Sequence, residues 1–124
     1  MYQVMYRVIQ KVKSRIVPTV LNKTVAAIVT PDQALYGALI GNSGATAEVI
    51  FTLPSAFPGA VLNVTVAAAQ NVKLKLATAD TIRGLATAGQ FYTNNVIGSS
   101  LKLMCLVPTV WERVSAVNGT WVAS

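Results

Sequence analysis

The 124-residue sequence contains no histidine, one cysteine and only four acidic residues. The absence of histidine removes the most common general base, the most common metal ligand, and the Ser-His and Cys-His pairs of nucleophilic catalysis. A carboxylate pair that hydrolyses glycosides would have to come from Asp32, Glu48, Asp80 and Glu112, none of which lies in a short catalytic or metal-binding motif. The sequence therefore predicts a protein that is not an enzyme and uses no metal or other cofactor.

The single cysteine and the short apolar runs argue against two further classes. Cys105 has no second cysteine for a disulfide and lies in the apolar run 101–106, so we expect a buried structural thiol. Apolar runs such as 25–29 and 64–69 are far shorter than the roughly 18–20 residues that a membrane-spanning helix needs. Basic residues interrupt the N-terminal segment, which disfavours an export signal. We expect no membrane contact.

Positive charge is concentrated at the N-terminal end of the chain. Five of the ten basic residues lie within the first 23 positions, with no acidic residue among them: Arg7, Lys11, Lys13, Arg15 and Lys23. The other 101 residues carry five basic and four acidic residues, a net charge of only +1. The sequence therefore divides into a basic N-terminal arm, residues 1–33, and a nearly neutral body, residues 34–124. A field concentrated on one segment suits contact with an acidic surface.

The conformation and the partner of the arm each remain open at this level. Apolar residues recur at helical spacing from Tyr2 to Ile16, whereas Val4, Tyr6 and Val8 alternate with polar neighbours as in a strand. The β-branched residues favour an extended arm. Its charge suits an acidic protein shell, nucleic-acid phosphates or solvent alone. Only Tyr2 and Tyr6 could stack on bases, so we favour the protein shell and disfavour nucleic acid.

From residue 34 onward, short alternating runs recur between turn residues, which is typical of an all-β domain. The clearest is 72–76, where alternation places three aliphatic side chains inside and both lysines in solvent. We expect further strands at 47–53, 62–66, 101–106, 110–114 and 120–122, with an Asn118-Gly119 hairpin turn before the last and one long loop over 84–98. No internal repeat is found. The pattern predicts an antiparallel β-sandwich or barrel of jelly-roll type.

The composition indicates that the chain associates with other chains. Hydrophobic residues make up 53 % of the sequence and charged residues 11 %, whereas a typical soluble domain carries about 25 % charged residues. A body of about 90 residues buries only roughly 60–65 % of its unfolded surface, so apolar side chains remain outside and mark interfaces. Phe91, Tyr92 and Trp121 are our candidates for a subunit interface or a receptor-facing cluster.

Several segments together resemble a small β module of tailed-bacteriophage virion proteins. They are Asn42-Ser-Gly-Ala-Thr-Ala-Glu-Val-Ile-Phe-Thr-Leu-Pro54, Ala56, Pro58-Gly59, Val66-Ala-Ala-Ala-Gln-Asn-Val72, Asp80-Thr-Ile-Arg83, Ile97-Gly-Ser-Ser-Leu-Lys-Leu103 and the ending Trp111 to Asn118-Gly-Thr-Trp121. The resemblance covers about residues 35–124 and does not include the first 33. Such modules occur in capsid decoration (cement) proteins, head fibres and tail fibres, usually as homotrimers. The resemblance implies a structural role without catalysis.

These expectations combine into a trimeric cement protein on the outer capsid surface of a virion. The arm, residues 1 to about 30, would reach onto neighbouring subunits of the major capsid protein, and three arms would multiply many weak contacts. The alternative is a phage head or tail fibre, spike or tail component. In that case the body would bind a host receptor such as a glycan, or another virion protein.

Overall fold

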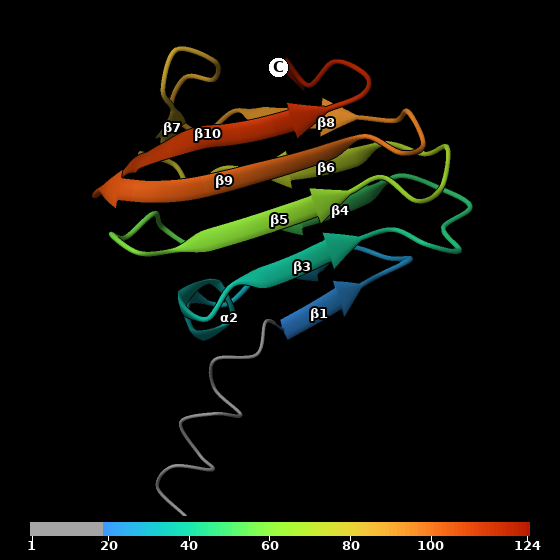
Figure 1. Cartoon of the computed structure of the whole chain (residues 1–124), viewed down its shortest axis with the longest axis horizontal. Coiled ribbons are helices and arrows are strands. Elements are labelled where there is room, and N and C mark those ends of the chain that lie inside the picture. Colours follow the sequence, from blue (N-terminus) through green and yellow to red (C-terminus); the bar gives the residue numbers. More distant parts are fainter. Residues whose placement is uncertain (1–18) are drawn as a thin grey trace, which may run out of the picture.

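The computed structural model describes residues 19–124, which form two facing β-sheets (Figure 1). One sheet has six strands in the order β1-β3-β5-β9-β10-β7, and the other has five in the order β11-β8-β6-β4-β2. The elements are β1 (Thr19–Asn22), β2 (Ala27–Ile28), α2 (Pro31–Leu35), β3 (Ala38–Gly41), β4 (Val49–Thr52), β5 (Val61–Thr65), β6 (Val72–Lys75), β7 (Thr81–Ile82), β8 (Phe91–Asn94), β9 (Ser100–Val107), β10 (Val110–Val117) and β11 (Val122–Ala123). The all-β prediction is confirmed.

The first six strands form a stack of coils. Consecutive strands alternate between the two sheets, so each passage through both sheets makes one coil. In the six-stranded sheet Thr19 pairs with Ala38, 19 residues later, and Ala38 pairs with Leu62, 24 residues later. Parallel neighbours need a crossover, and here a strand in the opposite sheet serves as that crossover instead of a helix.

The last strands close the stack with antiparallel pairs. β9 pairs with both β5 and β10, and β8 pairs with β6 and β11. The prediction of an antiparallel sandwich is therefore wrong, because five of the nine pairings in residues 19–124 are parallel and both sheets are mixed. The physical reason is the coil itself, which returns each strand to its sheet in the same direction.

The core lies between the two sheets, and the alternation read from the sequence identifies its residues. Inward positions of the central strands are fully buried, including Phe51, Leu62, Leu74 and Leu103. Trp111 from β10 is the largest fully buried side chain. The burial of these alternating positions between the inner faces of the two sheets supplies most of the driving force for folding.

The predicted boundary of the arm at residue 33 is wrong for its second half. β1 and β2 are paired strands of the two sheets, and α2 begins with a capping box in which Thr30 and Gln33 exchange hydrogen bonds. Residues 19–33 therefore belong to the body. The remainder of the arm, with Arg7, Lys11, Lys13 and Arg15, lies outside the described residues.

Two local predictions near the C-terminal end also need correction. The segment 84–98 is not one loop, because it contains β8. Asn118 and Gly119 do adopt positive φ, 55° and 59°, as the turn prediction requires. They do not form a hairpin, however, because β10 and β11 lie in different sheets and β11 pairs with β8. The turn instead carries the chain from one sheet to the other.

Two asparagine side chains, one buried and one exposed, tie successive coils together. Asn42, directly after β3, is fully buried; its Oδ1 accepts the N–H of Ala67 (2.8 Å) and of Ala68 (3.0 Å), and its Nδ2 donates to the carbonyls of Ala68 (3.2 Å) and Gln70 (3.4 Å). Asn22 makes a similar pair of bonds to the main chain of Ser43 one coil earlier. These side chains satisfy loop groups that the parallel ladder leaves without partners.

We predict that Asn42→Ala lowers the free energy of unfolding by about 2–4 kcal/mol, because it removes four hydrogen bonds and leaves buried main-chain groups unpaired. Urea unfolding followed by tryptophan fluorescence measures this change. Asn63→Ala on β5 is the matched control, since Asn63 makes no side-chain hydrogen bond among the described residues, and it should change stability by less than about 0.5 kcal/mol. Equal effects of the two substitutions would contradict the role of Asn42.

Candidate interaction surfaces

The stack of coils is open at the end formed by β1 and β2 (Figure 1). Each is the outermost strand of its sheet, with no further strand beside it in the described part of the chain. The N–H groups of Thr19 and Lys23 donate to the carbonyls of Gly37 and Gly41, both at 3.0 Å. Successive main-chain N–H groups of a strand point to opposite sides, so those of Val20 and Asn22 point away from β3. A free edge of this kind can pair with another chain.

Exposed aliphatic side chains surround this open end. We call Val20, Val25, Ile28 and Leu39 the open-end patch. The exposed fraction is 67 % for Val20 and 71 % for Ile28. Val20 lies directly beside Leu39 on the outward face of the six-stranded sheet, whereas Ile28, which pairs with Thr52, lies on the outward face of the five-stranded sheet. β1 itself, Thr-Val-Leu-Asn, contains none of the charged residues or prolines that commonly protect sheet edges. The open-end patch is therefore suited to being covered by another surface.

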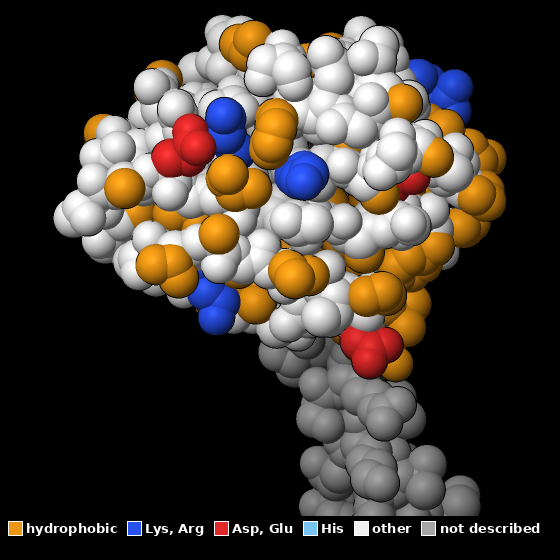
Figure 2. Space-filling model, turned by 180° about the vertical axis from the view of Figure 1, so that it is seen from behind, with side chains coloured by type: hydrophobic (Ala, Val, Ile, Leu, Met, Phe, Trp, Pro, Cys, Tyr) orange, Lys and Arg blue, Asp and Glu red, His pale blue; other side chains and the backbone are white. Residues whose placement is uncertain are grey.

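A second apolar surface lies at one end of the strands. We call Leu35, Tyr36, Leu106 and Val107 the turn-end patch; all four are exposed, and they come from the region of α2 and from the end of β9. Figure 2 shows hydrophobic side chains gathered along the corresponding side of the body. Neighbouring exposed apolar side chains of this kind mark contact surfaces more often than single ones do.

Of the five predicted arm cations, only Lys23 lies among the described residues. It directly follows β1, its main chain bonds to Gly41, and its residue is exposed at the open end of the stack. Lys23 is thus part of the body, although it contributes positive charge beside the open-end patch. The other four cations join the body through this same end, because β1 is the first described element.

The three predicted contact aromatics do not form an exposed cluster. Tyr92 and Trp121 are 1 % and 6 % exposed, and their rings stack inside the chain with centroids 5.8 Å apart. Trp121 also donates from Nε1 to the carbonyl of Ser100 at 3.3 Å. Their burial makes them core residues, which removes them as receptor-facing groups. Phe91 is half-buried on the outward face of β8, where the ammonium of Lys73 lies 4.9 Å from its ring centre.

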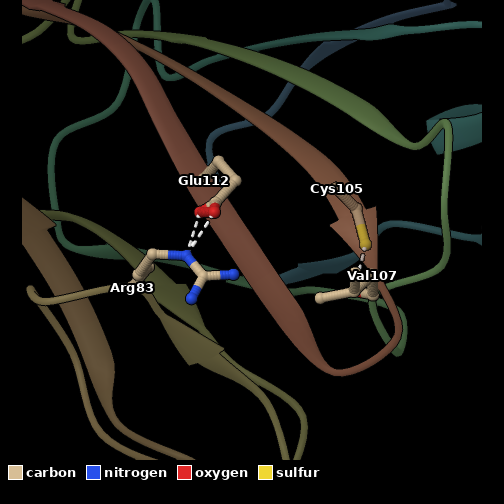
Figure 3. A network of polar contacts seen from close by, with 4 residues as sticks. All are labelled: Arg83, Cys105, Val107 and Glu112. Atoms are coloured by element: carbon tan, nitrogen blue, oxygen red, sulfur yellow. Dashed lines mark hydrogen bonds and ion pairs between the residues drawn. The ribbon is translucent and has the colours of Figure 1, made fainter.

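The polar network near β7 and β10 has a structural explanation (Figure 3). Arg83 donates from Nε to the carboxylate of Glu112, at 2.9 Å to Oε2, and so ties the segment after β7 to β10. Cys105 is buried, as predicted, and its thiol donates to the carbonyl of Val107 at 3.0 Å. Burial, helped by the negative charge of Asp80, raises the pKa of the Cys105 thiol, which disfavours the reactive thiolate.

Two further features of residues 19–124 bear on metal binding and on membrane spans. No three His, Cys, Asp or Glu side chains gather closely enough there to hold a metal ion. Within the same residues no helix is both long and apolar enough to cross a membrane.

We predict that the chain self-associates through the open-end patch and that Val20→Asp abolishes this association without unfolding the body. Val20 is exposed in the single chain, whereas a carboxylate in a covered interface would be desolvated and unpaired. The loss of about 2–3 kcal/mol of apolar contact corresponds to a drop of roughly 30- to 150-fold in the association constant.

Sedimentation velocity measures this association directly. Val117→Asp is the matched control, because Val117 is also an exposed strand valine but lies on β10, away from the open end. We expect Val20→Asp to be monomeric and the control to form the same oligomers as the wild type. If only Val117→Asp dissociated the oligomer, the interface would lie at β10 and not at the open end.

No protein-family model, curated protein or solved structure matches this chain. The resemblance to phage virion modules stays a prediction from the sequence segments that carry it.

Proposed function

We propose that this protein is a structural component of a bacteriophage virion. In this proposal it is a homotrimeric cement protein that binds the outer surface of the capsid and stabilises the shell. Its partners are two further copies of itself and the major capsid protein. The arm, now limited to the residues before Thr19, provides the positive charge that contacts neighbouring capsid subunits.

The observation that carries the proposal is the meeting of two features at one end of the body. The free edges of β1 and β2 and the open-end patch lie where the basic segment joins the stack. A second copy of the chain at this end would cover the apolar side chains, while the basic segment that joins the body there would be free to reach an acidic capsid surface. Apolar burial supplies the affinity between copies, and the charges favour and steer the contact with the acidic shell.

Cations of the body are paired with carboxylates, which supports the arm, and not the body, as the source of the positive charge that binds an acidic partner. Lys73 lies 3.6 Å from the carboxylate of Glu48, and Arg83 pairs with Glu112. These pairs leave the body with little uncompensated charge. The five cations before residue 24 have no acidic residue among them, so they dominate the field that an acidic shell would meet.

Burial of Tyr92 and Trp121 weighs against the fibre or spike alternative in its original form. An exposed aromatic cluster of Phe91, Tyr92 and Trp121 would support receptor binding, and only Phe91 of the three reaches the surface. The cement proposal does not need them. It needs apolar side chains at an open end, and Val20 and Ile28 meet that requirement.

We predict that changing Arg7, Lys11, Lys13 and Arg15 together to Gln releases the protein from capsid shells and leaves the body folded. If each exposed pair contributes about 0.5 kcal/mol, one arm loses about 2 kcal/mol, or roughly thirtyfold in affinity, and three arms lose more. Co-sedimentation with purified shells, with copies per shell counted by mass spectrometry, measures the loss.

The control changes Lys75 and Lys102 of the body to Gln, which should leave attachment intact. Wild-type copy number is a second readout, because a cement protein occurs in amounts comparable to the capsid subunit. Undiminished attachment of the arm variant, or only a few wild-type copies on each particle, would refute the proposal.

A further inference from the structure

A groove of about 310 Å³ crosses the outward face of the five-stranded sheet. It lies over β6, β8 and β11, away from the free edge of β2. In the register of these strands, Lys73 pairs with Thr93 and Thr93 pairs with Val122, so the three side chains form one row. Asn71, Asn95 and Thr120 also line the groove. Each lies two positions from a residue of that row, just beyond the end of its strand.

The residues that line the groove are mostly polar, but they carry little free charge. The ammonium of Lys73 lies 3.6 Å from the Glu48 carboxylate, and Asn71 donates from Nδ2 to the same carboxylate at 3.3 Å. The positive charge is therefore compensated before any ligand arrives. This compensation makes a bare anion a poor fit and favours a neutral ligand that offers several hydrogen bonds.

Several polar side chains of the groove, among them Thr93, Asn95 and Thr120, have no hydrogen-bond partner among the described residues. Asn95 and Thr120 are exposed and offer an amide and a hydroxyl to the groove. The hydroxyl of Thr93 is buried and unpaired although the residue itself is only half-buried. Rotation about χ1 exchanges its hydroxyl and its methyl group, so a ligand in the groove can recruit a group that the protein leaves unsatisfied.

We propose that this groove binds a neutral saccharide. An amide side chain both donates and accepts, and a hydroxyl does the same, which matches the neighbouring hydroxyl groups of a sugar ring. Val122 is exposed beside them and offers an apolar contact for the C–H face of the ring. The inference rests on the body alone and does not depend on the proposed capsid role.

The test is an NMR titration of the full-length chain with D-glucose, D-galactose, D-mannose and N-acetyl-D-glucosamine, followed by a disaccharide of each. Binding predicts shifts of the amide signals of Asn71, Thr93, Asn95 and Thr120, with dissociation constants of about 0.1–10 mM for so open a site. A disaccharide that binds more tightly than its unit would indicate a polymeric glycan, whereas equal affinity would indicate a free sugar; both support the proposal.

Thr93→Val keeps the shape of the side chain and removes the hydroxyl. We expect at least about fivefold weaker binding with an unchanged or raised melting temperature, because the lost group has no partner in the free protein. Thr52→Val is the matched control, since Thr52 lies on the outward face of the same sheet outside the groove. This variant should bind the sugar with the affinity of the wild type. Thr120→Ala, at an exposed site, should weaken binding similarly.

Three results would overturn the proposal. The first is the absence of shifts with every sugar up to about 50 mM, well above the range in which such sites fill. The second is tighter binding of inorganic phosphate or sulfate than of any sugar at the same amides. The third is an unchanged affinity in both Thr93→Val and Thr120→Ala.

Discussion

Parallel stacking of coils is the constraint on which the rest of this structure depends. A stack built from strands that alternate between two sheets leaves an edge on each sheet at both of its ends. At the end that the last strands close, the outermost strands are β7 and β11, each only two residues long, and the buried pair Tyr92 and Trp121 packs beside β11. At the other end β1 and β2 have no neighbour in the described residues, so that end carries unpaired main-chain groups and exposed aliphatic side chains.

This asymmetry links the fold to the proposed function. The closed end and the loops are held by the chain's own hydrogen bonds, of which those of Asn42 are the most complete. The open end offers what association needs, apolar area and free hydrogen-bonding groups, at the point where the basic segment meets the body. The proposed saccharide groove lies over β6, β8 and β11, away from β1 and β2, so assembly at the open end and ligand binding can occur together.

The sequence predicted most strands correctly but not their pairing. Alternation identifies a strand with one buried face, and it is the same whether the neighbouring strand is parallel or antiparallel. Because the coils share a shape without sharing residues or one fixed length, no repeat indicated them. Tyr92 and Trp121 looked like contact residues because sequence alone does not distinguish a core aromatic from an exposed one. Asn42 had no signal beyond its glycine-rich turn, since its role depends on loops that lie 25 or more residues away.

Hydrogen exchange at the free edge tests the central claim most directly. The amides of Val20 and Asn22 point away from β3, whereas those of Thr19 and Lys23 are bonded to it. In the self-associated full-length chain, followed by NMR, the account predicts that Val20 and Asn22 exchange slowly, and that both exchange rapidly once the chain is dissociated by dilution. Rapid exchange of both amides in the assembled state would show that the open end is not where the protein is covered.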